Sequence, residues 1–455
     1  MAFLCDAGRG RPVLLTLNLV LFLAAACAGA QGPNPATAQS QPASAQPVSI
    51  TLEEAIKRAQ ANEPAFATAV ADSRVAALDR SIARSALLPS VIYHNQALYT
   101  QPLVHGDNST VRFIANNAVH EYFSQGMVGE TIGLGQVAGL RLADATAALA
   151  RAQLEIARRG LVVTVTGLYY GVISADNKLG IAQLARSEAA NFTDLTGKRE
   201  QQRESAHADV VKAQLQQQQR ERELSDARVA AEKARLELGV LLFPDPRTPF
   251  ALSAPASPQL ASRSDVEQAA GKNNPELRSA LASLAQSNAD VFAARGAYLP
   301  SLGLNYTYGI DAPQFATYRP GPDHLRNLGY SASVTLDLPV WDWLATEHKV
   351  KQSEIRRDAA KIALTATQRR FIARLDEAYS EAAAARDQLA SLDASVATAE
   401  ESLRLTKMRY TGGEATVLEV VDAQTAFVTA ENAREDGRVR YQAALADLQT
   451  LTGTM

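Results

Sequence analysis

Two acidic residues follow a glycine pair near the carboxyl end of the chain, in the stretch RYTGGEATVLEVVDAQ at residues 409–424. The carboxylates of Glu419 and Asp422 are three residues apart, so they share one face if this stretch is helical. If several copies of the chain met around an axis, like charges ~8 Å apart would repel by roughly 2 kcal/mol per pair and would favour bound cations. An ordinary solvated helix face is the alternative, and a single chain does not decide between the two.

The sequence contains no motif that indicates an enzyme. The segment IGLGQVAGL fits the pattern G-x-G-x-x-A at Gly133, Gly135 and Ala138. A dinucleotide site would need a short βαβ unit there, whereas the residues that follow predict one helix of many turns. The six histidines have no metal-type spacing, and the sequence has no serine-nucleophile or phosphate-loop motif. We therefore expect no catalytic residue, no metal and no cofactor.

The glycine pair interrupts a composition typical of long helices. Glycine ends helices because it adopts the left-handed conformation easily, so Gly412 and Gly413 predict a stop and a reversal at a tip. The uninterrupted arm over 137–202 would measure roughly 100 Å at ~1.5 Å per residue, too long for a globular core to bury. The returning arm predicts a coiled-coil seam, because its apolar residues are spaced alternately by three and four: Leu224, Ala227, Ala231, Ala234, Leu238 and Leu241.

The chain consists of two copies of one plan. LTGKREQQRESAHADVVKAQ (195–214) aligns without a gap on LTKMRYTGGEATVLEVVDAQ (405–424), at an offset of 210 residues. IARSALLPSV and AARGAYLPSL repeat at an offset of 211. Each copy predicts a helical hairpin, a β-hairpin and long helices. The expected boundaries are repeat 1 over 50–241 (β-hairpin about 90–134, long helices about 137–241), a linker over 242–264, and repeat 2 over 265–455 (β-hairpin about 301–339, long helices about 341–453).

The β-hairpins have alternating apolar and polar residues. LGLNYTYGI and YSASVTLDL alternate clearly in the second copy, whereas the strand returning over 119–134 alternates weakly. Four strands cannot close a barrel, and an open strand edge in lipid would leave its N–H and C=O groups without partners. Three chains would supply twelve strands, enough to surround a water-filled lumen. Trp341 and Trp343 follow the last strand, where they could anchor at a membrane surface or pack at the turn.

The amino-terminal residues predict export. Residues 1–30 resemble a signal peptide, with Arg9 and Arg11 before an apolar run and Ala28-Gly29-Ala30 as the cleavage site. Cys27 allows a second possibility, in which it becomes a lipidated first residue. Residues 31–49 form a Pro-, Ala- and Ser-rich flexible leader.

Composition argues against two classes of protein, those that bind nucleic acid and those with transmembrane helices. With 45 basic and 48 acidic residues the net charge is −3, which gives no basic field for nucleic acid. Beyond the amino terminus no run of 18 apolar residues predicts a transmembrane helix.

This layout resembles the TolC-like outer membrane efflux protein family. The resemblance spans about 50–453 and is carried by TLEEAIKRAQANEP, the two LPS segments, VTLDLPVWDW and RYTGGEATVLEVVDAQ. It implies a mainly α-helical homotrimer with a twelve-stranded barrel in the outer membrane of a Gram-negative cell. A helical coiled-coil barrel would continue across the periplasm and close at its far tip. Such proteins are passive ducts for efflux or secretion that dock on a periplasmic adaptor and an inner-membrane pump.

The resemblance also implies roles for residues near the tip. Tyr410 would hydrogen-bond Asp209 as a latch on the gate, and Glu419 with Asp422 would ring the periplasmic entrance. Ala415 stands where the best-known relative has a second, arginine latch, so that contact is lost here. The tip turns would dock the adaptor through Arg203, Glu204, Gly412, Gly413 and Val417.

Two other functions remain open at this point. One is a structural envelope coiled-coil protein without a conduit, and the other is an exported enzyme, for which no site was found. Neither the substrate nor the particular pump can be read from the sequence, because a wide duct leaves selection to the pump.

Overall fold

A computed structural model describes residues 48–99, 120–253, 259–318 and 326–453, all within the compact unit Pro47–Met455. The expected signal peptide with Cys27, and nearly all of the expected leader, lie outside the described residues.

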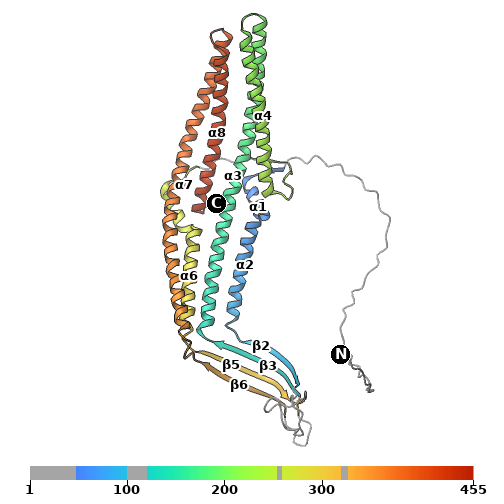
Figure 1. Cartoon of the computed structure of the whole chain (residues 1–455), viewed down its shortest axis with the longest axis vertical. Coiled ribbons are helices and arrows are strands. Elements are labelled where there is room, and N and C mark those ends of the chain that lie inside the picture. Colours follow the sequence, from blue (N-terminus) through green and yellow to red (C-terminus); the bar gives the residue numbers. More distant parts are fainter. Residues whose placement is uncertain (1–47, 100–119, 254–258, 319–325, 454–455) are drawn as a thin grey trace, which may run out of the picture. The chain divides into compact units, whose positions relative to one another are not determined.

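The same order of elements occurs twice along the chain (Figure 1). It is a short strand, two helices, two strands and two long helices. The first set is β1 (Val48–Ile50), α1 (Leu52–Asn62), α2 (Pro64–Ser85), β2 (Ser90–Tyr99), β3 (His120–Ile132), α3 (Leu134–Gln201) and α4 (His207–Leu242). The second set is β4 (Phe250–Leu252), α5 (Arg263–Asn273), α6 (Pro275–Gly296), β5 (Ser301–Ala312), β6 (Leu328–Asp337), α7 (Ala345–Thr411) and α8 (Val417–Thr452).

Prolines and polar caps set where the shorter helices begin. Pro64 and Pro275 each occupy the first turn of a helix, where no backbone donor is needed. Asn274 accepts a hydrogen bond from the Leu277 N–H at 2.7 Å and so caps α6. Thr51 caps α1 in the same way through the N–H of Glu54.

The β-hairpins of both repeats join in one antiparallel sheet of order β2-β3-β5-β6. The strand β3 is regular over its whole length despite its weak alternation, because it pairs with β2 on one side and β5 on the other. Gly309 permits this close pairing, since a Cβ there would collide with the backbone of Ser124 and Gln125. Within the chain, β2 and β6 each pair along a single edge.

The two faces of this sheet differ in polarity. On β5 and β6 the apolar pairs share one face: Leu302 with Leu336, Leu304 with Val334, Tyr306 with Ala332 and Tyr308 with Tyr330. On the other face the hydroxyls of Thr307 and Ser331 lie 2.6 Å apart. The apolar side chains of Tyr306, Tyr330 and Val334 are exposed in the single chain.

The long helices pair as hairpins that leave the sheet. The helix α3 packs along α4, α7 packs along α8, and α3 also contacts α8 (Figure 1). The helix α3 begins at Leu134, three residues before the expected start, because Gly133 provides an extended N-cap. The helix α7 begins at Ala345, later than expected, because Trp343 and Leu344 adopt left-handed conformations with φ of 56° and 64°.

No described helix combines the length and the apolar composition that crossing a membrane requires.

Two short strands that the sequence did not predict form a hydrophobic core with α1, α3 and α4. The strands β1 and β4 pair in parallel, so the expected linker over 242–264 contains a strand of its own. Tyr169 of α3 is fully buried beneath them, and its hydroxyl donates to the carbonyl oxygens of Ile50 at 3.0 Å and Ser253 at 2.5 Å. This side chain therefore links the starts of both repeats to the first long helix.

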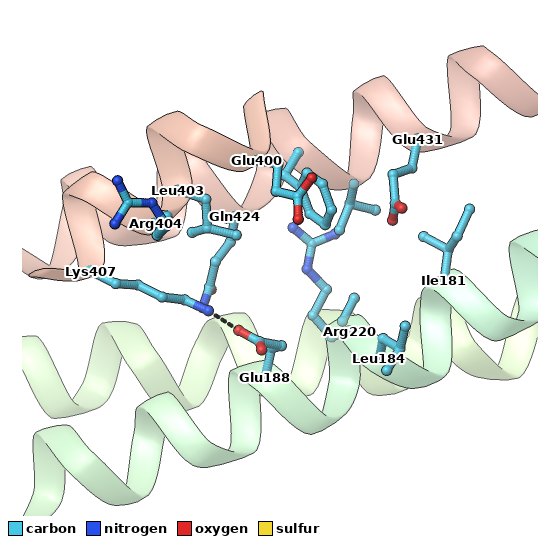
Figure 2. A pocket seen from close by; sticks show the side chains of 13 residues that line it. Ile181, Leu184, Glu188, Arg220, Glu400, Leu403, Arg404, Lys407, Gln424 and Glu431 are labelled. Carbon is cyan, nitrogen blue, oxygen red and sulfur yellow. Dashed lines mark hydrogen bonds and ion pairs between the residues drawn. The ribbon is translucent and has the colours of Figure 1, made fainter. Parts of the chain in front are cut away.

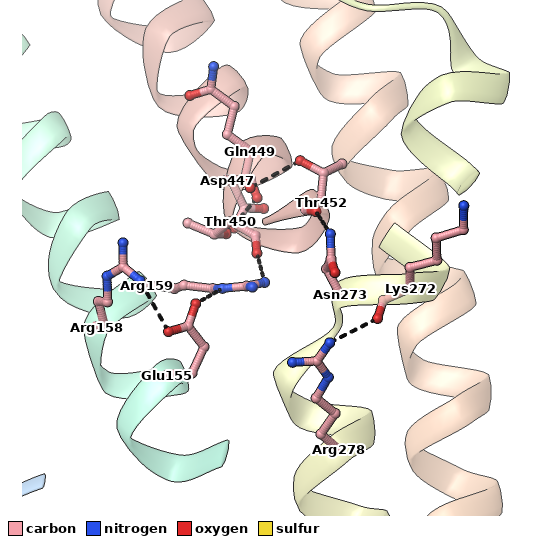
Figure 3. A network of polar contacts seen from close by, with 10 residues as sticks. All are labelled: Glu155, Arg158, Arg159, Lys272, Asn273, Arg278, Asp447, Gln449, Thr450 and Thr452. Atoms are coloured by element: carbon pink, nitrogen blue, oxygen red, sulfur yellow. Dashed lines mark hydrogen bonds and ion pairs between the residues drawn. The ribbon is translucent and has the colours of Figure 1, made fainter. Parts of the chain in front are cut away.

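Side chains from α3 and α5 hold the carboxyl end of α8 (Figure 3). Arg159 of α3 donates to the carbonyl oxygen of Thr450 at 2.6 Å and is itself oriented by Glu155 at 2.8 Å. Asn273, the last residue of α5, donates to the carbonyl oxygen of Thr452 at 3.4 Å. These bonds satisfy carbonyl groups that a helix end leaves free, and the bond from Arg159 joins the two repeats.

Candidate functional site at the helical tips

Each long hairpin reverses through a turn of the same geometry; we call them the first tip turn (202–206) and the second tip turn (412–416). In the second tip turn Gly413 has a φ of 81°, and the N–H of Glu414 donates to the carbonyl oxygen of Arg409 at 2.8 Å. Gly412 keeps a right-handed conformation with φ of −77°. The left-handed cap is therefore carried by Gly413 alone.

The first tip turn makes the same reversal without glycine. Arg203 takes the left-handed position with a φ of 65°, and the N–H of Glu204 donates to the carbonyl oxygen of Arg199 at 2.8 Å. The backbone is thus shared although the residues differ. Because a side chain in this conformation costs about 1 kcal/mol or more, Arg203 is a strained position.

Tyr410 lies in a small core that joins the two tips. Its ring packs against Phe192 at a centroid distance of 5.1 Å, and its hydroxyl lies 3.3 Å from Oγ1 of Thr196. Within this chain the expected pairing of Tyr410 with Asp209 is not made. Asp209 lies at the start of α4, where its carboxylate is 3.5 Å from the Ser205 hydroxyl. A negative charge is stabilised at the amino terminus of a helix, which explains an acidic residue at this position without a latch.

Arg199 is a tip residue that the sequence motifs did not single out. Its guanidinium donates to the carbonyl oxygen of Tyr410 at 2.5 Å and that of Thr411 at 3.4 Å, and it lies over the Tyr410 ring at 4.9 Å. A cation at the carboxyl end of α7 satisfies free carbonyls and opposes the helix dipole. One signal was present: Arg199 aligns with Arg409 between the repeats.

Glu419 is engaged within its own chain. Its carboxylate accepts from the backbone N–H and the hydroxyl of Thr416, both at 3.2 Å, and lies 3.4 Å from the Arg409 guanidinium. The hydrogen bond from the Thr416 backbone, then that from its hydroxyl and the charge of Arg409, hold the pKa of Glu419 below its ordinary value. Glu419 therefore closes a capping box at the start of α8.

Asp422 differs from Glu419 because it is exposed and, within the described residues, has no hydrogen bond or ion pair. Of the two expected entrance acids, Asp422 is the freer charge.

The residues expected to dock the adaptor differ in their solvent exposure. Arg203, Glu204, Gly412 and Gly413 are exposed on the tip turns. Val417 is only 2% exposed and packs with Phe192, Tyr410 and Val420. The expectation that Val417 contacts a partner does not fit this position, and its role here is to build the tip core.

The two tryptophans lie at the junction of β6 and α7. Trp341 and Trp343 are 68% and 83% exposed and contact each other edge to face, with centroids 5.7 Å apart. They do not pack into a core at this turn, which was the alternative to a membrane-surface position.

Among the described residues, neither the glycine motif nor the potential metal ligands form a binding site. Gly133 and Gly135 lie at the start of a helix of 68 residues, so they are not part of a short βαβ unit. Across the described residues, no three His, Cys, Asp or Glu side chains gather as a metal site.

Comparison with known proteins finds one family model that matches part of the chain. Residues 266–454 match the family model described as "Outer membrane efflux protein". The chain is 28% identical over 177 residues to outer membrane protein OprJ of Pseudomonas aeruginosa, covering 39% of this chain and 36% of OprJ. It is 23% identical over 421 residues to outer membrane protein TolC of Vibrio cholerae, covering 89% and 91% of the two chains. The chain thus spans only about a third of OprJ but most of TolC.

Solved structures share the fold. The outer membrane channel CmeC of Campylobacter jejuni superimposes with a TM-score of 0.76 at 18% identity, over 88% of this chain and 85% of CmeC. The family resemblance inferred from sequence motifs is confirmed by the family model, and the fold is shared with this solved channel.

Proposed function

This chain is a relative of the outer membrane efflux proteins, and from that premise we propose that it is a passive exit duct. Three copies assemble in the outer membrane of a Gram-negative cell and extend into the periplasm. The duct serves efflux of small molecules or secretion, and takes its energy from an inner-membrane pump reached through a periplasmic adaptor.

The observation that carries this proposal is the incomplete sheet. In the four-stranded sheet β5 and β6 have an exposed apolar face and an opposite polar face, and among the described residues the outer edges of β2 and β6 have no strand paired to them. Edges with free N–H and C=O groups need partners, and in lipid the requirement is absolute. Three chains joined β6 to β2 would give twelve strands with the apolar face outward and the polar face around a lumen.

The contacts between the hairpins support a gate at the tips. Arg199 and Thr196 of α3 hold Tyr410 of α7, so the tip of α7 and α8 is tied to the tip of α3 and α4. We place the latch of this protein at Arg199 and Tyr410 instead of Asp209 and Tyr410. Opening would break these bonds while the backbone of each hairpin stays intact.

Exposed residues at the tips and at the β6–α7 junction would fill three remaining roles: an acidic collar, contact with the adaptor and anchoring at the membrane surface. Asp422, with Glu419 beside it, would form an acidic collar where three chains approach each other. The tip turns, through Arg203, Glu204, Gly412 and Gly413, would contact the adaptor. Trp341 and Trp343 would lie at the membrane surface, where exposed aromatic side chains are favoured.

A structural coiled-coil protein without a conduit is less consistent with these features. Such a protein would have no use for a sheet with one apolar and one polar face, and the family match is to efflux proteins.

The assembly is tested by cross-linking the sheet edges. Ile92 of β2 and Ser331 of β6 lie in one row on the same face of the sheet, through Met127 and Thr307. A variant with cysteine at Ile92 and at one of Ser331, Ser333 or Thr335 should form covalent dimers and trimers on oxidation. Each single-cysteine variant is the control and should stay monomeric on a denaturing gel. If every double variant cross-links only within one chain, the sheet closes on itself and the trimeric duct is wrong.

A further inference from the structure

A pocket of about 330 Å³ lies between the two long hairpins, below the tips (Figure 2). All four long helices line it. Its apolar wall consists of Ile181 and Leu184 from α3, Leu403 from α7, and Phe427 and Val428 from α8. A space equal to roughly ten water molecules with such a wall has the size and character of a small-molecule site.

The basic side chains around the pocket are already paired. Lys407 forms an ion pair with Glu188 across the hairpins (Figure 2). Arg404 pairs with Glu401 at 2.7 Å. Arg220 is buried and donates to Glu223 at 2.6 Å and to Thr425 at 2.9 Å. These contacts leave no basic group in the lining available for an anion.

Two acidic side chains of the lining are not paired in this way. Within the described residues, neither Glu400 nor Glu431 makes a hydrogen bond or an ion pair within 4 Å, although both line the pocket. Burial raises the pKa of Glu431, the nearby charge of Arg434 lowers it, and the charges of Glu400 and Glu435 raise it further. A cation placed beside Glu431 and Glu400 would relieve this desolvation and repulsion.

A buried amide provides an independent sign of a missing partner. Gln424 of α8 is 5% exposed, lines the pocket, and its Nε2 has no hydrogen-bond partner. In Figure 2 its side chain extends from α8 into the space between the hairpins. A buried amide without a partner costs about 1–3 kcal/mol, so a ligand that accepts this hydrogen bond would gain from it.

We propose that this pocket binds an amphipathic organic cation. Its apolar body would lie against Leu184, Leu403 and Phe427, an acceptor oxygen would meet Nε2 of Gln424, and a protonated amine would lie beside Glu431 and Glu400. The ligand would contact both hairpins at once and would hold them in the arrangement described here. The test of this site by ligand binding does not depend on the duct.

The experiment is calorimetric titration of the purified full-length protein in detergent with propranolol, which carries a naphthyl ring, an ether oxygen and a protonated amine. The control ligand is 1-naphthoxyacetate, which keeps the ring and the ether oxygen but is an anion. We expect saturable binding of propranolol, and binding of the anion weaker by at least about tenfold, the effect of one half-buried charge pair.

Two variants locate the site. Glu431→Gln should weaken propranolol binding about tenfold, and it should not unfold the protein, because removing a charge that burial disfavours relieves a cost. Leu184→Trp replaces an exposed side chain at the pocket wall and should abolish binding by filling the space. Glu377→Gln, an exposed carboxylate of α7 outside the pocket, should bind as the wild type does. Absence of saturable binding, or equal binding by all three variants, would overturn the proposal and indicate partition into detergent.

Discussion

Arg203 occupies in the first tip turn the left-handed position that Gly413 fills in the second. Replacing Arg203 with glycine removes the steric cost of that conformation but makes the unfolded turn more flexible, so we expect a net local gain of about 0.5–1 kcal/mol. Hydrogen exchange of the amides between Gln202 and His207 should slow by about two- to fivefold.

The second repeat supplies the matched control. A Cβ on Gly413 would meet nothing within 4 Å, so Gly413→Ala introduces conformational strain without a collision. Exchange at the second tip turn should therefore become faster. If Arg203→Gly also speeds exchange in the first turn, the Arg203 side chain stabilises the turn by more than its conformation costs.

Arg199 and Arg409 align between the repeats but bond differently. Arg199 reaches across to the carbonyl oxygens of Tyr410 and Thr411, whereas Arg409 bonds within its own hairpin, to the carbonyl oxygen of Glu414 at 3.1 Å and to Glu419. Arg199→Ala should therefore loosen the contact between the hairpins and raise the conductance of the closed channel in a planar bilayer.

The control for this prediction is Arg409→Ala, which should leave closed-state conductance near the wild-type value. Tyr410→Phe removes only the 3.3 Å contact with Thr196 and should have a smaller effect than Arg199→Ala. Equal conductance of the Arg199 and Arg409 variants would argue against a latch at Arg199.

At the scale of elements, the helices and strands were largely predictable because their signals are local. The LPS segments, the alternation in β5 and β6, and the glycine pair each predict their element from a few neighbouring residues. The strands β1 and β4 were missed because three residues carry no periodicity and pair only with each other. The start of α7 was misplaced because nothing in the residue types of Trp343 and Leu344 predicts a positive φ.

The tip contacts were less predictable because they join residues more than 200 positions apart. Thr196, rather than Asp209, lies beside the Tyr410 hydroxyl, and Val417 is turned into the tip core. These facts depend on how α3 packs along α8 and meets the end of α7 at the tip. The alignment of the repeats places residues at equivalent turns but does not say which turns touch.

The junction between β6 and α7 allows a spectroscopic test, because Trp341 and Trp343 are the only two tryptophans of the chain. In bilayers that contain lipids brominated near the headgroup, their fluorescence should be quenched strongly, and lipids brominated near the chain end should quench less. Trp343→Phe should retain this depth profile at lower intensity. Equal, weak quenching by both lipids would place the junction in water.

At the scale of the whole molecule, the sheet has two edges to which no other described strand pairs and an exposed apolar face on β5 and β6, while the helical hairpins are tied to each other within the chain. The helices therefore have internal partners, and the sheet requires external ones. We expect assembly through the sheet to satisfy the strand edges and to enclose a polar surface in the same step.

The central claim is that this assembly encloses a conducting path, and single-channel recording in a planar bilayer tests it most directly. The wild-type protein should give discrete, cation-preferring conductance steps, small because Arg199 ties the tips of the two hairpins together, and Arg199→Ala should enlarge them. A purified trimer that inserts into the bilayer and conducts nothing, with or without the Arg199 substitution, would contradict the duct.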